Sequence, residues 1–185
     1  MEAVGQDSGA VPTTKEYHKA ARELCDKYGM LLIYDEVVTG FRLGMGGAQS
    51  IFGTSPDLTV FGKIIGGGYA GSGGIGGRKE IMSMLTAGVD ASDNIKVKVG
   101  GTMTANPLTS LAGITVIKEL ERLNVHDALD KASDYFMRGI ADLSEKYDVP
   151  AIIYHHSSIL HIDVSGVQHV PYCIDSKDPQ FQSQL

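Results

Sequence analysis

The hydrophobic positions in the first part of the chain predict a helix followed by a buried strand. Apolar and aromatic residues recur every three or four positions over residues 14–28, with charged residues between them, which is the pattern of an amphipathic helix. Thr13 or Thr14 can cap the start of this helix, and Gly29 can end it. Residues 30–34 are then apolar without alternation. Such a run predicts a strand buried on both faces, as in a parallel sheet.

A second apolar strand is predicted over residues 58–61, and it leads through Gly62 to Lys63. Asp35 and Glu36 follow the first strand in a similar way. Asp35 and Lys63 are 28 positions apart, which leaves room for one loop-and-helix crossover, so the two strands can be parallel neighbours. Both side chains are then expected at one edge of the sheet, where open α/β sheets bind ligands.

The glycine-rich stretch over residues 66–77 predicts tight turns at the edge of the sheet. Residues 71–76 match the dinucleotide-binding pattern G-x-G-x-x-G by letter. No apolar strand leads directly into these residues, so the match is a weak indication of a phosphate site. A short helix is predicted next, over residues 78–85.

Two long helices and two strands are predicted in the second half of the chain. A proline suits the first turn of a helix over residues 107–123, and Asn106 can cap it. Residues 125–147 predict a second helix, and residues 150–154 and 159–164 predict strands that open a further α/β unit. The apolar stripe of the second helix consists of Ala128, Leu129, Ala132, Phe136, Ile140 and Leu143.

Composition and charge narrow the class of protein. The 185 residues are 43% hydrophobic and 21% charged, which is ordinary for a globular protein with a real core. A net charge of −6, without long Lys/Arg runs, argues against nucleic acid or an anionic membrane as the main partner. No apolar run is long enough to cross a bilayer. Cys25 and Cys173 indicate no disulfide framework, so a reducing cytoplasm is the expected compartment.

Lys63 and Asp35 are the first candidates for chemistry. Lys63 lies between apolar residues and glycines, and an amine that loses its water shell there is a candidate nucleophile for a Schiff base. The alternative is an ordinary surface lysine at the end of a strand. Asp35 is expected at a ligand-binding sheet edge, but a carboxylate in that place can also simply cap the following turn.

Two further groups of residues allow more than one interpretation. Gly100, Gly101 and Thr102 precede the helix over residues 107–123, so they can form either an anion site or an ordinary capped turn. The cluster with metal-ligand chemistry consists of His155, His156, His161 and Asp163. No fixed ligand spacing is met there, so no metal is expected.

Three stretches of the sequence together resemble the class-III aminotransferases. They are L-L-I-Y-D-E-V-V-T-G-F-R (residues 31–42), P-D-L-T-V-F-G-K-I-I-G-G-G (56–68) and G-G-T-M-T-A-N-P-L-T-S-L-A-G (100–113). Within that family, F-R-L-G-M-G-G-A-Q and the G-T-x-x-x-N-P signature resemble the glutamate-1-semialdehyde 2,1-aminomutase branch.

The resemblance implies pyridoxal 5'-phosphate (PLP) as cofactor and a role for each candidate residue. Lys63 resembles the lysine that holds the cofactor aldehyde and moves a proton at the substrate carbon. Asp35 resembles the acid that pairs with the pyridine nitrogen, and Val37 resembles the residue that packs on one face of the ring. Thr102 resembles the threonine that reaches the phosphate in the partner subunit's site. A homodimer with the site at its interface, acting on a small amino acid or amine, is therefore implied.

The resemblance also implies an architecture, the aspartate-aminotransferase-like fold type I of PLP-dependent transferases. Residues 1–124 would form the C-terminal half of the large domain, with part of a parallel-rich sheet and helices on both faces. Residues 125–185 would form the linking helix and the start of the small C-terminal α/β domain. The family's chains are more than twice as long, so we expect a fragment that is poorly stable and scarcely active alone.

Two other functions remain open from the sequence. The first is another class-III transaminase, which passes the amino group of an amine or a β- or ω-amino acid to a keto acid. The second is a truncated relative without catalytic activity that acts in dimerisation.

Overall fold

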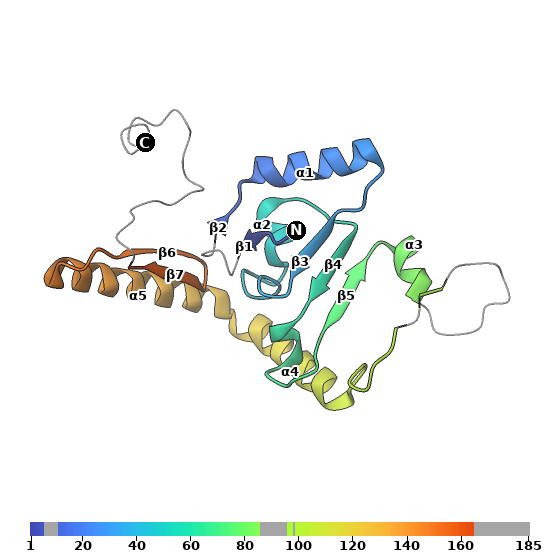
Figure 1. Cartoon of the computed structure of the whole chain (residues 1–185). Helices are drawn as coiled ribbons and strands as arrows, with labels where there is room; N and C mark the ends of the chain where they lie inside the picture. Colours follow the sequence, from blue (N-terminus) through green and yellow to red (C-terminus); the bar gives the residue numbers. More distant parts are fainter. Residues whose placement is uncertain (6–10, 86–95, 98, 165–185) are drawn as a thin grey trace.

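The computed structural model describes residues 1–5, 11–85, 96–97 and 99–164 (Figure 1). Cys173 and the end of the predicted second domain lie outside these residues. Near the N-terminus, β1 (Val4–Gly5) pairs antiparallel with β2 (Val11–Pro12). Across the residues described, no helix has both the length and the hydrophobicity that crossing a membrane requires.

A three-stranded sheet with the order β3-β4-β5 lies at the centre of the first part of the chain. β3 (Ile33–Glu36) runs parallel to β4 (Leu58–Phe61), with Asp35 opposite Val60. β5 (Gly74–Gly77) adds to the other side of β4 in the antiparallel direction. The predicted parallel pairing of the strands that lead to Asp35 and Lys63 is thus confirmed.

The helix α1 (Lys15–Tyr28) has the ends that the sequence predicts. Thr14 caps it by accepting a hydrogen bond from the backbone N–H of Tyr17. Gly29 ends it in the left-handed region, with a φ of 65° that glycine adopts without steric cost. The short helix α2 (Gly47–Phe52) follows β3 and also ends at a left-handed glycine.

The hydrophobic core lies between these two helices and one face of β3. His18 of α1 is fully buried, hydrogen-bonded to the Tyr34 hydroxyl and stacked on the Phe52 ring at 4.0 Å between centroids. Burial lowers the pKa of His18, which favours the neutral imidazole in this apolar setting. The buried residues of the cluster are Ala3, Val4, Leu32, Tyr34, Leu43, Ala48, Phe52 and Ile159.

The opposite face of β3 corrects the prediction of a strand buried on both faces. The strand begins at Ile33 and includes Asp35 and Glu36, so successive side chains alternate between two faces. Tyr34 and Glu36 point toward the helices and are fully buried. Ile33 points the other way and is 41% exposed, and Ile75 of β5 on the same side is 44% exposed, so the described residues cover this side only in part. We call this side the open face of the sheet.

The strand β5 corrects the prediction of tight turns throughout residues 66–77. Gly74–Gly77 form an edge strand, and glycine is needed there for close packing. A Cβ atom on Gly77 would lie 2.4 Å from the carbonyl oxygen of Asp57. Half of the G-x-G-x-x-G letters therefore lie inside a strand, whereas a dinucleotide fingerprint requires a loop before a helix. The predicted helix after this strand is confirmed as α3 (Lys79–Met82) and the 3-10 turn η2 (Ser83–Leu85).

Two long helices with the predicted bounds follow, α4 (Pro107–Leu123) and α5 (Val125–Tyr147) (Figure 1). The antiparallel hairpin β6 (Ile152–His156) and β7 (Ile159–Asp163) folds back onto α5. Ser157 at the tip of the hairpin donates a hydrogen bond of 2.7 Å to Asp130 of α5.

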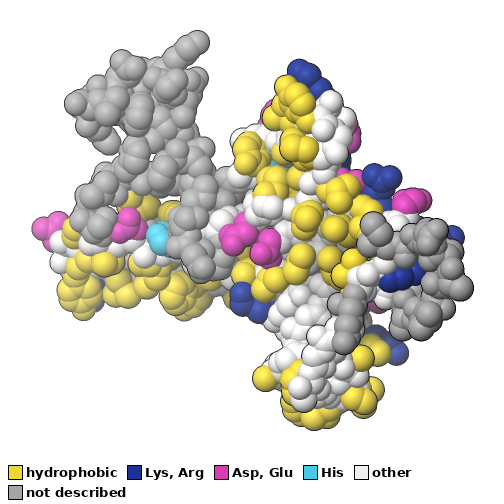
Figure 2. Space-filling view, turned by 45° about the vertical axis from the view of Figure 1, so that its right-hand side comes forward, with side chains coloured by type: hydrophobic (Ala, Val, Ile, Leu, Met, Phe, Trp, Pro, Cys, Tyr) yellow, Lys and Arg dark blue, Asp and Glu magenta, His cyan; other side chains and the backbone are white. Residues whose placement is uncertain are grey.

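The apolar stripe of α5 divides between two faces. Leu129 and Ile140 are half-buried, whereas Phe136 and Leu143 are 47% and 49% exposed. Hydrophobic side chains also reach the surface on other parts of the molecule (Figure 2). Ala128 and Ala132 are exposed as well, so most of the stripe is not covered by described residues.

Asp57 connects α1, the start of β3 and the end of β5. Its carboxylate is nearly fully buried and accepts hydrogen bonds from Arg22 at 2.7 Å, the Leu32 N–H at 2.7 Å and Arg78 at 3.0 Å. Burial alone would raise the pKa of Asp57. The hydrogen bonds from Arg22, Leu32 and Arg78 outweigh that effect and hold the pKa at about 2.

Acid is therefore expected to weaken the fold through Asp57. The ordinary pKa of this carboxyl is 3.8, so its stabilising contribution is complete above that pH and is lost as the pH falls toward about 2. Asp57→Asn should lower the free energy of unfolding near neutral pH by about 2 kcal/mol and flatten the acid dependence. Urea unfolding at several pH values measures both effects, with Asp127→Asn on the exposed side of α5 as the control. Equal acid dependence in the two variants would contradict the prediction.

Candidate active site

Lys63 stands at the carboxyl end of β4 as the first residue of the 3-10 turn η1 (Lys63–Gly66). Its φ of 48° lies in the left-handed region, which is unfavourable for a lysine. Strained backbone of this kind is concentrated at functional sites. The unusual conformation therefore supports a special role for this residue.

The surroundings of Lys63 correct the predicted desolvation. The side chain is exposed at the turn that follows β4. Its amine makes no hydrogen bond or ion pair with any described residue. Among the described residues the lysine is thus an exposed amine without a partner, and it can react with a ligand at the sheet edge.

Asp35 lies on the adjacent parallel strand and points to the same open face. Its backbone N–H donates to the carbonyl oxygen of Met1 at 2.9 Å, so β3 is held on its outer edge as well as by β4. The carboxylate oxygen Oδ1 accepts the backbone N–H of Val37 at 2.9 Å. The second oxygen, Oδ2, has no hydrogen-bond partner within the described ranges. One oxygen is therefore fixed by the backbone, and the other can accept a hydrogen bond from a ligand.

Val37 lies beside the segment that delivers Lys63. A Cβ atom on Gly62 would be 3.0 Å from Cγ1 of Val37, so the absence of a side chain at Gly62 allows this close packing. Val37 is half-buried, with part of its surface still accessible. The structure thus brings Asp35, Val37 and Lys63 together at one edge of the sheet.

Glu36 is a second carboxylate in this region. In the sequence, residue type alone does not distinguish its role from that of its neighbour Asp35. Glu36 is fully buried on the helical side and accepts hydrogen bonds from the Thr39 hydroxyl and from the N–H groups of Ala48 and Gln49. Adjacent residues of a strand point to opposite faces, so only one of the two acids can face a ligand. That alternation is the sole sequence signal for the different roles of the pair.

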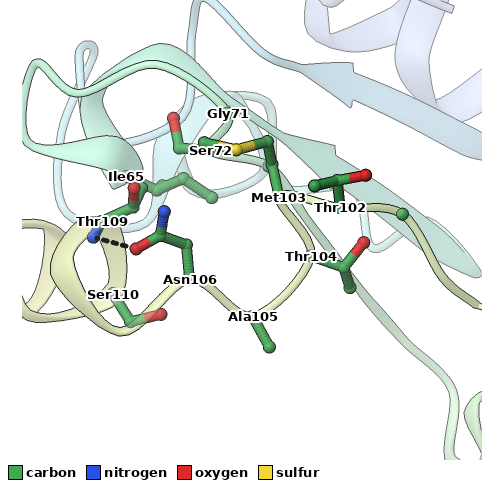
Figure 3. A pocket seen from close by; sticks show the side chains of 12 residues that line it. Ile65, Gly71, Ser72, Thr102, Met103, Thr104, Ala105, Asn106, Thr109 and Ser110 are labelled. Atoms are coloured by element: carbon green, nitrogen blue, oxygen red, sulfur yellow. Dashed lines mark hydrogen bonds between the residues drawn. The ribbon is translucent and has the colours of Figure 1, made fainter.

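Thr102 lines an open hollow of about 630 Å³ beside the N-terminus of α4, and the other three predicted residues are not among those that line it (Figure 3). Ser72 and Ile65 also line the hollow, and Ile65 belongs to the turn that begins at Lys63. Asn106 accepts hydrogen bonds from the N–H groups of Leu108 and Thr109, which confirms the capped turn. An anion site at Thr102 stays a prediction.

The helix α4 supports the turn at Lys63 through direct backbone contact. Gly113 faces η1 so closely that a Cβ atom there would lie 1.9 Å from the carbonyl oxygen of Ile65. Gly67, with a φ of 59°, ends η1 against Ala112 of the same helix. The position of Lys63 therefore depends on two glycines at this contact.

Gly113→Ala is expected to push α4 away from η1 and to destabilise the fold by about 2 kcal/mol, the cost of overpacking a tight contact. Gly139→Ala in α5 is the matched control, since nothing lies within 4 Å of its added Cβ atom. Alanine in that open helical position should be neutral or stabilising by up to about 1 kcal/mol. Urea unfolding of the two variants compares them directly. Similar unfolding midpoints would disprove the proposed contact.

The histidines that the sequence offers as metal ligands contact other protein side chains. His155 is hydrogen-bonded to Asp134 at 3.1 Å, and His156 stacks on Phe52 with 6.2 Å between ring centroids. His161 lies against the ring of Tyr154. In the part of the chain that the structure describes, no three His, Cys, Asp or Glu side chains gather as potential metal ligands.

Comparison with known proteins gives one consistent result. Residues 1–174 match the family described as Aminotransferase class-III. The glutamate-1-semialdehyde 2,1-aminomutase of Legionella pneumophila (strain Corby) is 42% identical over 150 residues, which are 81% of this chain and 33% of that protein. The chain thus spans about a third of the length of the curated relatives it matches.

Solved structures agree with this result. An omega-transaminase from Sphaerobacter thermophilus superimposes with a TM-score of 0.77 and 33% identity, over 88% of this chain and 36% of that one. A transaminase with PLP bound gives a TM-score of 0.75 and 26% identity, over 87% of this chain and 37% of that one. These similarities confirm the predicted α/β fold, fold type I of the PLP-dependent transferases.

Proposed function

Because the chain belongs to the class-III aminotransferase family, we propose that the protein carrying it transfers amino groups with PLP as cofactor. The observation that supports this function most strongly is the position of Asp35 and Lys63 at the ends of two adjacent parallel strands. An acid and an unpaired amine at one sheet edge are the two groups that this chemistry requires of the protein.

The residues at the sheet edge fit this cofactor. The Lys63 amine has no partner among the described residues, so it can attach to an aldehyde. Asp35 Oδ2 can accept a hydrogen bond from a protonated pyridine nitrogen, and Val37 offers an accessible apolar surface for one face of the ring. When bound, PLP withdraws electrons from the substrate carbon. The Lys63 amine would then remove a proton from that carbon and return one, while Asp35 keeps the ring nitrogen protonated.

We also propose a homodimer in which Thr102 serves the partner subunit's site. Two observations support this arrangement: Thr102 lines a hollow to which Asp35, Val37 and Lys63 do not contribute, and this hollow is open beside the first turn of α4. The N-terminus of a helix favours a phosphate group. The substrate would be a small amino acid or amine, and the compartment would be the cytoplasm.

A division into two domains at residue 124 is part of the same proposal. Residues 1–124 would belong to the large domain and residues 125–185 to the linking helix and the small domain. The packing of the β6–β7 hairpin on α5 supports this division. Ile159 of the hairpin also joins the core of the first part, so the two units share an apolar contact.

Among the possible reactions, we favour the intramolecular amino transfer of glutamate-1-semialdehyde 2,1-aminomutase over a transaminase with a separate keto-acid acceptor. The relative with that activity in its name is 42% identical, compared with 33% for the omega-transaminase. Regeneration of the cofactor without an added keto acid distinguishes the two reactions. A non-catalytic role in dimerisation is disfavoured by the presence of Asp35, Lys63 and Thr102 together.

Reductive trapping tests the proposed function. The purified protein is incubated with PLP, reduced with borohydride and digested, and the modified lysine is located by mass spectrometry. Modification confined to the peptide with Lys63 is the expected result. Modification spread over the exposed lysines, or absent from Lys63, would overturn the proposal.

A further inference from the structure

We propose that Glu36 and Thr39 are positioning residues, a buried pair that holds Asp35 and Val37 in place for the cofactor. The inference rests on the proposed function, since it concerns how the same site is built. Neither residue faces the open side of the sheet, because both are buried on the helical side, with exposed fractions of 0% and 1%. They would therefore act through Asp35 and Val37 rather than by touching the cofactor.

The Glu36 carboxylate is the centre of this arrangement. Its oxygen Oε2 accepts the Thr39 hydroxyl and the Ala48 N–H, both at 2.9 Å, and Oε1 accepts the Gln49 N–H at 3.1 Å. Gly47 has a φ of 60°, and a Cβ atom there would lie 2.4 Å from Oε2. The first turn of α2 thus packs directly against the carboxylate.

The turn that follows Glu36 connects the buried carboxylate with Val37 and Asp35 on the open face. The Gly40 N–H donates to the Glu36 carbonyl oxygen at 2.9 Å, which closes the turn together with the bond from the Thr39 hydroxyl. A Cβ atom on Gly40 would lie 2.7 Å from that carbonyl oxygen, so the closure needs glycine. Val37 lies within this turn, and its N–H is the donor that fixes Asp35 Oδ1.

The Glu36 carboxylate is also linked to β4, the strand that leads to Lys63. Gln49, whose N–H is held by Glu36, donates from its side chain to the Thr59 hydroxyl of β4 at 3.0 Å. Val37 also packs against Gly62, directly before Lys63. The buried carboxylate is therefore linked through Gln49 to the first half of β4, and the turn that it closes packs on the end of β4 through Val37 and Gly62, so its loss should move the acid and the amine relative to each other.

The test uses two substitutions of one residue. Thr39→Val keeps the shape of the side chain and removes the hydrogen-bond donor, whereas Thr39→Ser keeps the donor and serves as the conservative control. Thr39→Val should raise the dissociation constant of PLP about tenfold, the effect of losing one hydrogen bond to a charged group. It should also shift the pH midpoint of the visible cofactor absorbance, because the turn that carries the Val37 N–H to Asp35 loses one of its two closing bonds. Thr39→Ser should match the wild-type protein in both measurements.

Glu36→Gln is the second variant, and it should change both readouts in the same direction as Thr39→Val, because an amide group replaces one of the two acceptor oxygens. Urea unfolding of each variant identifies any that fails to fold. If folded Thr39→Val and Glu36→Gln proteins keep the wild-type dissociation constant and pH midpoint, Glu36 and Thr39 are structural only and the inference is wrong. Failure of the wild-type protein to trap PLP on Lys63 would instead overturn the proposed function itself.

Discussion

In the whole protein that carries these residues, replacing Lys63 with alanine is expected to abolish covalent attachment of PLP and to lower the rate of amino transfer by about a thousandfold or more. The amine has two tasks in the proposed mechanism, since it holds the cofactor and moves the proton at the substrate carbon. No neighbouring residue can replace it, because the side chains placed beside it at the sheet edge are Asp35 and Val37. Reductive trapping and single-turnover kinetics measure the two losses separately.

Lys118→Ala is the matched control for this change. Lys118 is exposed in the middle of α4, so the substitution removes the same charge from the surface without touching the sheet edge. Both variants should unfold at nearly the same urea concentration as the wild-type protein, since the Lys63 amine has no partner among the described residues. Retention of a borohydride-reducible chromophore in Lys63→Ala would show that another lysine holds the cofactor.

The features predicted correctly from the sequence depend on local chemistry. The ends of α1 follow from one hydroxyl at Thr14 and one left-handed glycine at Gly29. The parallel pairing of β3 and β4 follows from the length of the connection between them. Such signals are contained within a few residues, so they hold whatever else the chain packs against.

The exposure of Ile33 and Lys63 could not be predicted in this way. Burial depends on the segments that cover a face, and a run of apolar residues does not reveal whether that cover is present. The strand nature of Gly74–Gly77 was hidden for a related reason. Gly77 at its end is required by close contact with Asp57 and Leu58, which are distant in sequence. Glycine is usually depleted in strands, so local propensity points to a turn.

Asp35 and Glu36 are acids of the same type, but the segments that pack on each face of β3 give them different roles. Both are acids, and both lie on the same strand. The face covered by α2 makes Glu36 an anchor with three donors, whereas the open face leaves one oxygen of Asp35 without a partner among the described residues. Mutation of the two should therefore give different results, with a direct effect on the reaction only at Asp35.

Asp35→Asn is expected to lower the rate of amino transfer by about a hundredfold or more while leaving the fold intact. An asparagine can still accept the Val37 N–H through its carbonyl oxygen, so the turn after β3 should keep its structure. Its amide group would then present a donor to the pyridine nitrogen. The ring would lose its proton and, with it, most of its capacity to withdraw electrons from the substrate carbon.

The measurement combines single-turnover rates with urea unfolding, and it includes Asp35→Glu and Asp127→Asn. Asp35→Glu keeps the charge but displaces it by one methylene group, so it should recover part of the rate. Asp127→Asn removes an exposed acid from the first turn of α5 and should leave the rate unchanged. A stable Asp35→Asn protein that reacts at the wild-type rate would mean that the proton of the ring nitrogen is held by a group other than Asp35. In that case, the pairing of acid and amine at the sheet edge would no longer support the proposed function.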